Sequence, residues 1–93
     1  MSTLIQTIEF SQIVEEVFTK TLVEKYQITA EAKERTQHID FDIVVRPPQF
    51  KNWLNGSILQ CWEHVNKRLE AHTIGITHNQ QTNEWILTSF IQK

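Results

Sequence analysis

The sequence predicts an α+β fold, an antiparallel sheet with two helices packed on one of its faces. Three stretches of the chain predict this arrangement. Residues 38–45 alternate between apolar and polar side chains, as a half-buried strand does. Residues 47–72 carry apolar side chains at helical spacing. Two β-rich runs near the C-terminus, separated by the polar residues 79–83, are typical of a hairpin.

The first quarter of the chain predicts a strand followed by a helix. Thr3–Glu9 alternates between apolar and polar residues and is rich in Ile and Thr, which favours a strand. The capping-box spacing Thr-x-x-Gln at its start favours a long helix instead, and this alternative stays open. Ser11 is a suitable N-cap, and apolar residues then recur at helical spacing through Tyr26. We therefore expect a helix over residues 11–26.

The segment before the prolines predicts at least one strand. Gln27–Gln37 has the composition of a helix but the alternation of an exposed strand, and both interpretations stay open. His38–Val45 is the clearest strand. Its apolar face carries Ile39, Phe41, Ile43 and Val45, and its other face carries His38, Asp40, Asp42 and Val44. Pro47 and Pro48 end the strand, since proline cannot donate a hydrogen bond to the sheet.

Residues 47–72 are predicted to form one continuous or gently kinked helix, against which the rest of the chain packs. Its apolar stripe comprises Phe50, Leu54, Ile58, Cys61, Trp62, Val65 and Leu69. Asn55-Gly56 is a helix stop signal, and Ser57 begins a capping box, so two helices over 48–54 and 58–71 are the alternative. Because the stripe stays in phase across Gly56, a single helix is favoured.

The C-terminal runs 73–78 and 84–91 are predicted to form the two strands of the hairpin. In the second run, Trp85, Leu87 and Ile91 face one side, and Ile86, Thr88 and Phe90 face the other. Since both faces are apolar, this strand is either central in the sheet or covered by a partner. If both ambiguous segments are strands, the order is β-α-β-β-α-β-β, which contains the ferredoxin-like pattern with an extra C-terminal strand. If neither is a strand, the order is α-α-β-α-β-β.

Length and composition predict a single domain over residues 1–93. The chain is 40% hydrophobic and 22% charged, which is ordinary for a globular protein. A single cysteine excludes an intrachain disulfide. Together with the absence of a signal-peptide pattern and of any membrane-length apolar run, this predicts a cytoplasmic location.

The charge distribution argues against nucleic acid as a partner, and the absence of a membrane-length apolar run argues against a membrane. Residues 1–45 hold four Lys/Arg and eight Asp/Glu, a balance of −4, whereas residues 46–93 hold five and three, a balance of +2. The net charge is −2, and the sequence has no run of basic residues. Nucleic-acid binding, which depends on phosphate neutralisation, is therefore not expected.

Two groups of residues have side chains that can ligate a metal ion. His38, Asp40 and Asp42 share one strand face, and Cys61 and His64 are three residues apart on the long helix. The same patterns are typical of a solvated strand face and of a cysteine in an apolar stripe, and this structural interpretation is favoured for both. The sequence also lacks a Gly-rich phosphate loop, G-x-S-x-G and H-E-x-x-H. No metal, no cofactor and no catalytic residue are expected.

A basic and aromatic cluster lies at the entry to the long helix. It comprises Arg46, Gln49, Phe50, Lys51 and Trp53. Tryptophan and arginine are enriched at protein interfaces, so we predict that Arg46, Phe50, Lys51 and Trp53 bind a partner, together with Trp85 of the two-sided strand.

The sequence therefore predicts a small, non-catalytic protein-interaction module, such as an adaptor, assembly factor or regulator. Self-association is expected, with a homodimer as one form and a further protein of unknown identity as another partner. The alternative is a nucleic-acid-binding or metal-dependent small enzyme. It would use His38, Asp40, Asp42 and the Arg46–Trp53 cluster.

Overall fold

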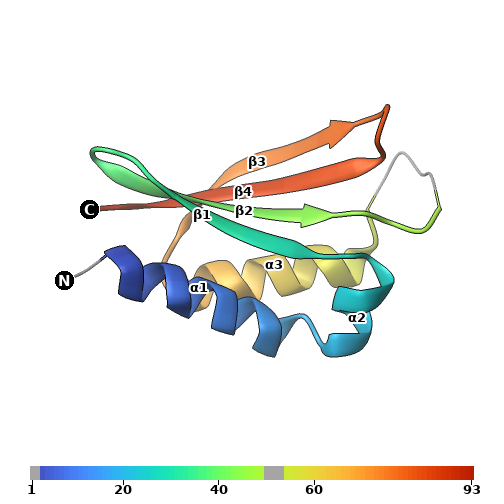
Figure 1. The fold of residues 1–93 in the computed structure, drawn as a ribbon, viewed down its shortest axis with the longest axis horizontal. Coiled ribbons are helices and arrows are strands. Elements are labelled where there is room, and N and C mark those ends of the chain that lie inside the picture. Colours follow the sequence, from blue (N-terminus) through green and yellow to red (C-terminus); the bar gives the residue numbers. More distant parts are fainter. Residues whose placement is uncertain (1–2, 50–53) are drawn as a thin grey trace.

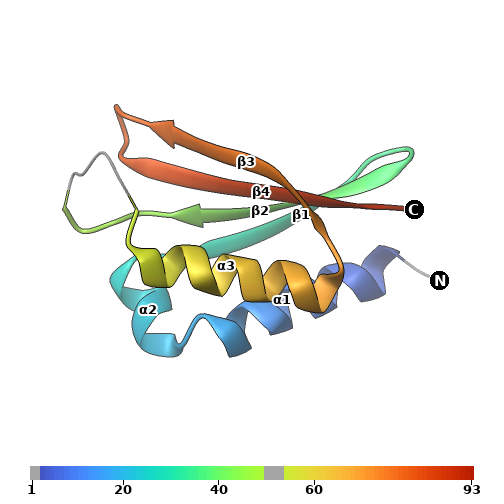
Figure 2. The ribbon, with the colours of Figure 1, turned by 180° about the vertical axis from the view of Figure 1, so that it is seen from behind.

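The computed structural model describes residues 3–49 and 54–93. The elements are α1 (Thr3–Val17), α2 (Lys20–Lys25), β1 (Thr29–Glu34), β2 (His38–Val45), α3 (Gly56–Leu69), β3 (His72–Asn79) and β4 (Glu84–Gln92). Each strand is antiparallel to its neighbours, in the sheet order β1-β2-β4-β3. Figure 1 shows α1 and α3 side by side on one face of the sheet, and the view from behind agrees (Figure 2). The predicted α+β fold is confirmed.

The strand predictions after residue 27 agree with this sheet. β2 has the predicted bounds and buries the four residues of its apolar face. The ambiguous segment 27–37 contains β1, which pairs with β2, so its strand interpretation is confirmed. The C-terminal hairpin forms as β3 and β4. β4 lies between β2 and β3, so the strand with two apolar faces is central in the sheet.

The strand predicted for Thr3–Glu9 is wrong, because these residues form the first half of α1. Phe10, Ile13 and Val14 are buried at helical spacing. No glycine or proline separates them from the preceding residues, so the helix extends back through the ambiguous run. Ser11 therefore lies inside a helix and does not cap one. The chain begins with helix where a ferredoxin-like order has its first strand, and the element order is α-α-β-β-α-β-β.

The predicted helix over 11–26 is interrupted near its middle. α1 ends at Val17, and α2 begins at Lys20. The side chain of Thr19 accepts a hydrogen bond from the backbone N–H of Leu22 at 3.4 Å, as an N-cap does. The fully buried Phe18 lies at the break between the two helices.

The continuous helix over 47–72 is also wrong. Residues 46–49 and 54–55 are not helical, and α3 begins only at Gly56. Asn55, which we interpreted as part of a stop signal, is the N-cap: its Oδ1 accepts from the backbone N–H of Ser57 at 2.9 Å. A proline also disfavours helical backbone at the residue before it. Pro47 has this effect on Arg46, and Pro48 has it on Pro47. The two-helix alternative predicted a helix over 48–54. The residues of this segment that the structure describes, 48, 49 and 54, are not helical.

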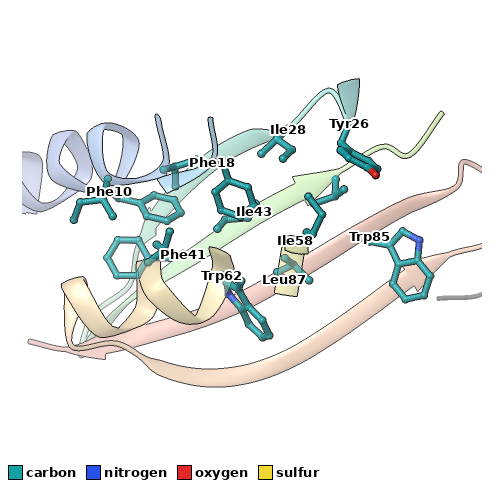
Figure 3. Packing of buried hydrophobic residues seen from close by; sticks show 14 of the residues in the cluster. Phe10, Phe18, Tyr26, Ile28, Phe41, Ile43, Ile58, Trp62, Trp85 and Leu87 are labelled. Carbon is teal, nitrogen blue, oxygen red and sulfur yellow. The ribbon is translucent and has the colours of Figure 1, made fainter. Parts of the chain in front are cut away.

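The core lies between the sheet and the two long helices. Ile58, Trp62 and Val65 face it from α3, as the apolar stripe predicted, and Leu54 is buried just before the helix. From the other helix, the ring of Phe10 packs on that of Phe41 in β2, with ring centroids 4.7 Å apart (Figure 3). The opposite face of the sheet carries neither α1 nor α3 (Figures 1 and 2).

Candidate functional site

The guanidinium of Arg46 is engaged within the fold itself. Its Nε donates to Glu84 Oε2 at 2.9 Å, and its Nη1 donates to the carbonyl of Gln27 at 2.8 Å and to Thr29 Oγ1 at 3.1 Å. The backbone N–H of Arg46 donates to the carbonyl of Tyr26 at 2.7 Å. These bonds tie the end of β2 to the starts of β1 and β4. Arg46 therefore has a structural role that its position in a basic cluster did not predict.

Most of the other residues of the predicted cluster are not described by the structure. Phe50, Lys51 and Trp53 lie outside the described residues. Of the five residues predicted to bind a partner, the structure thus describes Arg46 and Trp85. These two lie near the same end of the sheet, since β2 ends at Val45 and Val45 pairs with Trp85 in β4.

Trp85 is covered mostly by its own chain. Its side chain is 9% exposed, and its indole ring is stacked on the imidazole of His78 in β3, with centroids 3.9 Å apart and planes 8° from parallel. Trp85 lies near one end of the cluster of buried side chains (Figure 3). Its Nε1 is buried and has no hydrogen-bond partner among the described residues. Little of the ring is left for a partner.

The acidic residues of β2 lie beside basic side chains of β1, of the turn between β1 and β2, and of β2 itself. Asp40 lies 3.2 Å from Arg35 Nε and 3.2 Å from His38 Nε2, and Asp42 lies 3.7 Å from Lys33 Nζ. Within residues 3–49 and 54–93, no group of three His, Cys, Asp or Glu side chains is arranged to hold a metal ion. The geometry is that of ion pairs on a partly solvated sheet face, of which Lys33–Asp42 joins neighbouring strands.

Cys61 and His64 do not form a site either. His64 is exposed, whereas Cys61 is half-buried with its Sγ 3.7 Å from the carbonyl oxygen of Val17. Burial raises the pKa of the Cys61 thiol above its ordinary value. A raised pKa lowers the thiolate fraction at neutral pH, which is the opposite of what a nucleophilic cysteine requires.

Cys61 is therefore expected to react slowly with iodoacetamide in the folded protein. At about pH 7.5 we expect alkylation at least about tenfold slower than in denaturant, since both the raised pKa and the burial reduce access to the thiolate. The rate should increase steeply as the pH rises toward the pKa of the thiol. Mass spectrometry of the single cysteine measures both rates, and equal rates would show that the thiol is freely accessible.

The two edge strands of the sheet differ in a way that the sequence interpretation did not identify. β1 carries Glu31, Lys33 and Glu34, whereas β3 (HTIGITHN) carries no Asp, Glu, Lys or Arg. Ile74 and Ile76 of β3 are 57% and 43% exposed, and they are the large exposed apolar residues of the described chain. Charged residues protect an edge strand against pairing with another chain. β1 has such protection, and β3 lacks it.

The signal in the sequence for this strand is the lack of Asp, Glu, Lys and Arg in residues 72–79. The composition alone does not show that the strand is at an edge, because that depends on which strands pair. The structure places β3 at the end of the sheet order, hydrogen-bonded to β4 on one side only. β3 is therefore an eight-residue strand with one unpaired side.

Comparisons with known protein families, with curated proteins and with solved structures found no match. Among the helices of the described residues, none is both long enough and apolar enough to span a membrane. The candidate site therefore rests on its geometry. We define it as the β3 edge: the unpaired side of His72–Asn79 with the exposed side chains of Ile74 and Ile76.

Proposed function

We propose that this chain is a small, non-catalytic protein-interaction module, and that a strand of a partner protein adds to the β3 edge. The observation that carries the proposal is the contrast between the two edges of one sheet. The uncharged edge exposes two isoleucines, whereas the opposite edge is rich in charge. An unpaired edge strand offers backbone N–H and C=O groups that an extended segment of another protein can bind.

The two isoleucines add side-chain contacts to those backbone bonds. Exposed apolar residues that lie together mark surfaces for association. β-branched residues pack well against one another across paired strands. Backbone hydrogen bonds supply affinity in this mode of recognition, and the side chains along the strand supply specificity.

The charges around the alternative site are already paired. Asp40 and Asp42 each lie beside a basic side chain, and Arg46 is bound within the fold. These contacts favour a structural role for the charged residues, and thus the interaction module over a metal-dependent or nucleic-acid-binding enzyme.

A lysine at the β3 edge is expected to abolish partner binding. Ile76→Lys places a charge where an added strand would lie, which is how natural edge strands resist pairing. Tagged wild type and variant would be cross-linked in native lysate, and the captured proteins quantified by mass spectrometry. We expect proteins captured by the wild type to fall at least about tenfold with Ile76→Lys.

Gln80→Lys is the matched control. It adds the same charge at an exposed position in the turn that follows β3. This variant should capture the same proteins as the wild type, and circular dichroism should show both variants folded. Identical captures from all three proteins would contradict the proposal.

A further inference from the structure

The first seven residues of β3 have the same sequence in both directions. They read His72-Thr73-Ile74-Gly75-Ile76-Thr77-His78, with Gly75 at the centre. Each residue on one side of Gly75 is matched by an identical residue on the other. This symmetry lies in the strand that has an unpaired, uncharged side.

A two-fold axis makes an interface self-complementary, because the same surface is used by both copies. If two β3 strands pair antiparallel about an axis at Gly75, Ile74 of one copy lies opposite Ile76 of the other. Thr73 then lies opposite Thr77, and His72 opposite His78. Each residue therefore lies opposite a residue of the same type. Ile–Ile and Thr–Thr are favourable cross-strand pairs.

We propose that the occupant of the β3 edge is a second copy of this chain, paired through β3 about a two-fold axis at Gly75. This inference rests on the proposed function and names its partner. The two four-stranded sheets join edge to edge into one continuous antiparallel sheet. β3 has no Asp, Glu, Lys or Arg that would place like charges opposite each other in this pairing.

The opposite edge limits the assembly to two copies. Strand β1 carries three charged residues, and Glu34 at its end binds the side chain of Lys93 at 2.9 Å. Since an isologous contact through β3 uses the only uncharged edge of the sheet, association closes at the dimer and does not continue into a filament.

The central glycine makes the geometry directly testable. Gly75 has no positive φ, and a Cβ at this position would meet no atom within 4 Å. A cysteine therefore fits at position 75 in the single chain. Residues directly opposite in antiparallel strands have Cα atoms about 4.5–5.5 Å apart, which is within the range that a disulfide spans. The irregularity in the pairing with β4 lies between Thr73 and Gly75, within the symmetric run, so the test is placed at Gly75, where the regular ladder to Asn79 begins.

Gly75→Cys in a Cys61→Ala background is expected to form an intermolecular disulfide when treated with oxidised glutathione. The Cys61→Ala change removes the single native thiol. Asn79→Cys in the same background is the control. In the proposed pairing its two copies are eight positions apart along the strands, or about 27 Å, which no disulfide can span. On a non-reducing gel we expect at least about ten times more covalent dimer from position 75 than from position 79.

Sedimentation velocity of the unmodified chain tests the same pairing without oxidation. Because the contact is one strand wide, we expect the mass to rise from monomer toward dimer between about 1 μM and 1 mM. Ile76→Lys should remain monomeric over this range, and Gln80→Lys should behave as the wild type. A strictly monomeric wild type with no Gly75→Cys disulfide would overturn the second-copy inference.

The outcomes separate this inference from the proposed function. If the wild type is monomeric but Ile76→Lys still loses captured proteins, the β3 edge binds a different protein, and only the second-copy inference fails. If position 76 affects neither self-association nor capture, both fail. Efficient cross-linking at Ile76→Cys but not at Gly75→Cys would overturn the proposed two-fold axis.

Discussion

Phe41→Ala is expected to lower the free energy of unfolding by about 3–5 kcal/mol, the largest single effect among our predictions. Phe41 is 0% exposed, and its ring packs against that of Phe10. The substitution therefore removes a contact between the sheet and α1. Removing a buried ring loses its transfer free energy and leaves a cavity that the surrounding side chains fill only in part. Urea unfolding followed by circular dichroism measures the change.

Phe90→Ala is the matched control for this prediction. Phe90 is in the neighbouring strand β4 but faces the other side of the sheet, where it is half-buried between the rings of His38 and His72. The same substitution should cost clearly less there, about 1–2 kcal/mol, because solvent already reaches the ring. An equal loss at both positions would mean that the face opposite the helices is as tightly packed as the core.

The second large effect is expected at Ile58, in the first turns of α3. Ile58 is 0% exposed, and Ile58→Ala should lower the free energy of unfolding by about 2–5 kcal/mol. The change removes the first buried side chain within α3, where the helix first reaches the core (Figure 3). Thermal and urea denaturation would both report it.

Gln60→Ala separates this loss from any effect on helix formation. Gln60 is exposed and lies in the same helix, and alanine has the highest helix propensity. This variant should therefore be as stable as the wild type or slightly more stable. If Gln60→Ala and Ile58→Ala were equally destabilising, the stripe of α3 would not be the surface that anchors the helix to the sheet.

Local patterns in the sequence predicted β2 and the C-terminal hairpin correctly, because an alternating strand records which of its faces is buried. The apolar stripe through Ile58, Trp62 and Val65 was likewise predicted, although the start of its helix was not. The Asn55-Gly56 pair is compatible with both the end and the start of a helix. Asn55 acts as a start, with its Oδ1 on the backbone of Ser57 and its Nδ2 donating to Tyr26 Oη at 3.3 Å, a contact between distant parts of the chain.

The candidate site shows the same division. Arg46 and Trp85 were predicted as partner-binding residues from their chemical type. Arg46 bonds to residues 17, 19 and 38 positions away in the sequence, and Trp85 is covered by His78 of the neighbouring strand. Neither arrangement is visible in a local pattern. Conversely, residues 73–78 were predicted as a strand, yet nothing within them indicates whether one side or both sides are paired.

By itself, the sequence determined which face of β2 and of α3 is apolar, because the burial of side chains follows the repeat of each element. It also fixed the composition of β3, including its symmetry about Gly75 and its lack of charge. Only the tertiary structure decided that β4 is paired on both sides and that β3 is paired on one side only. The order of strands depends on hydrogen bonds between segments far apart in the chain, and the repeat within a strand records its faces but not its neighbours.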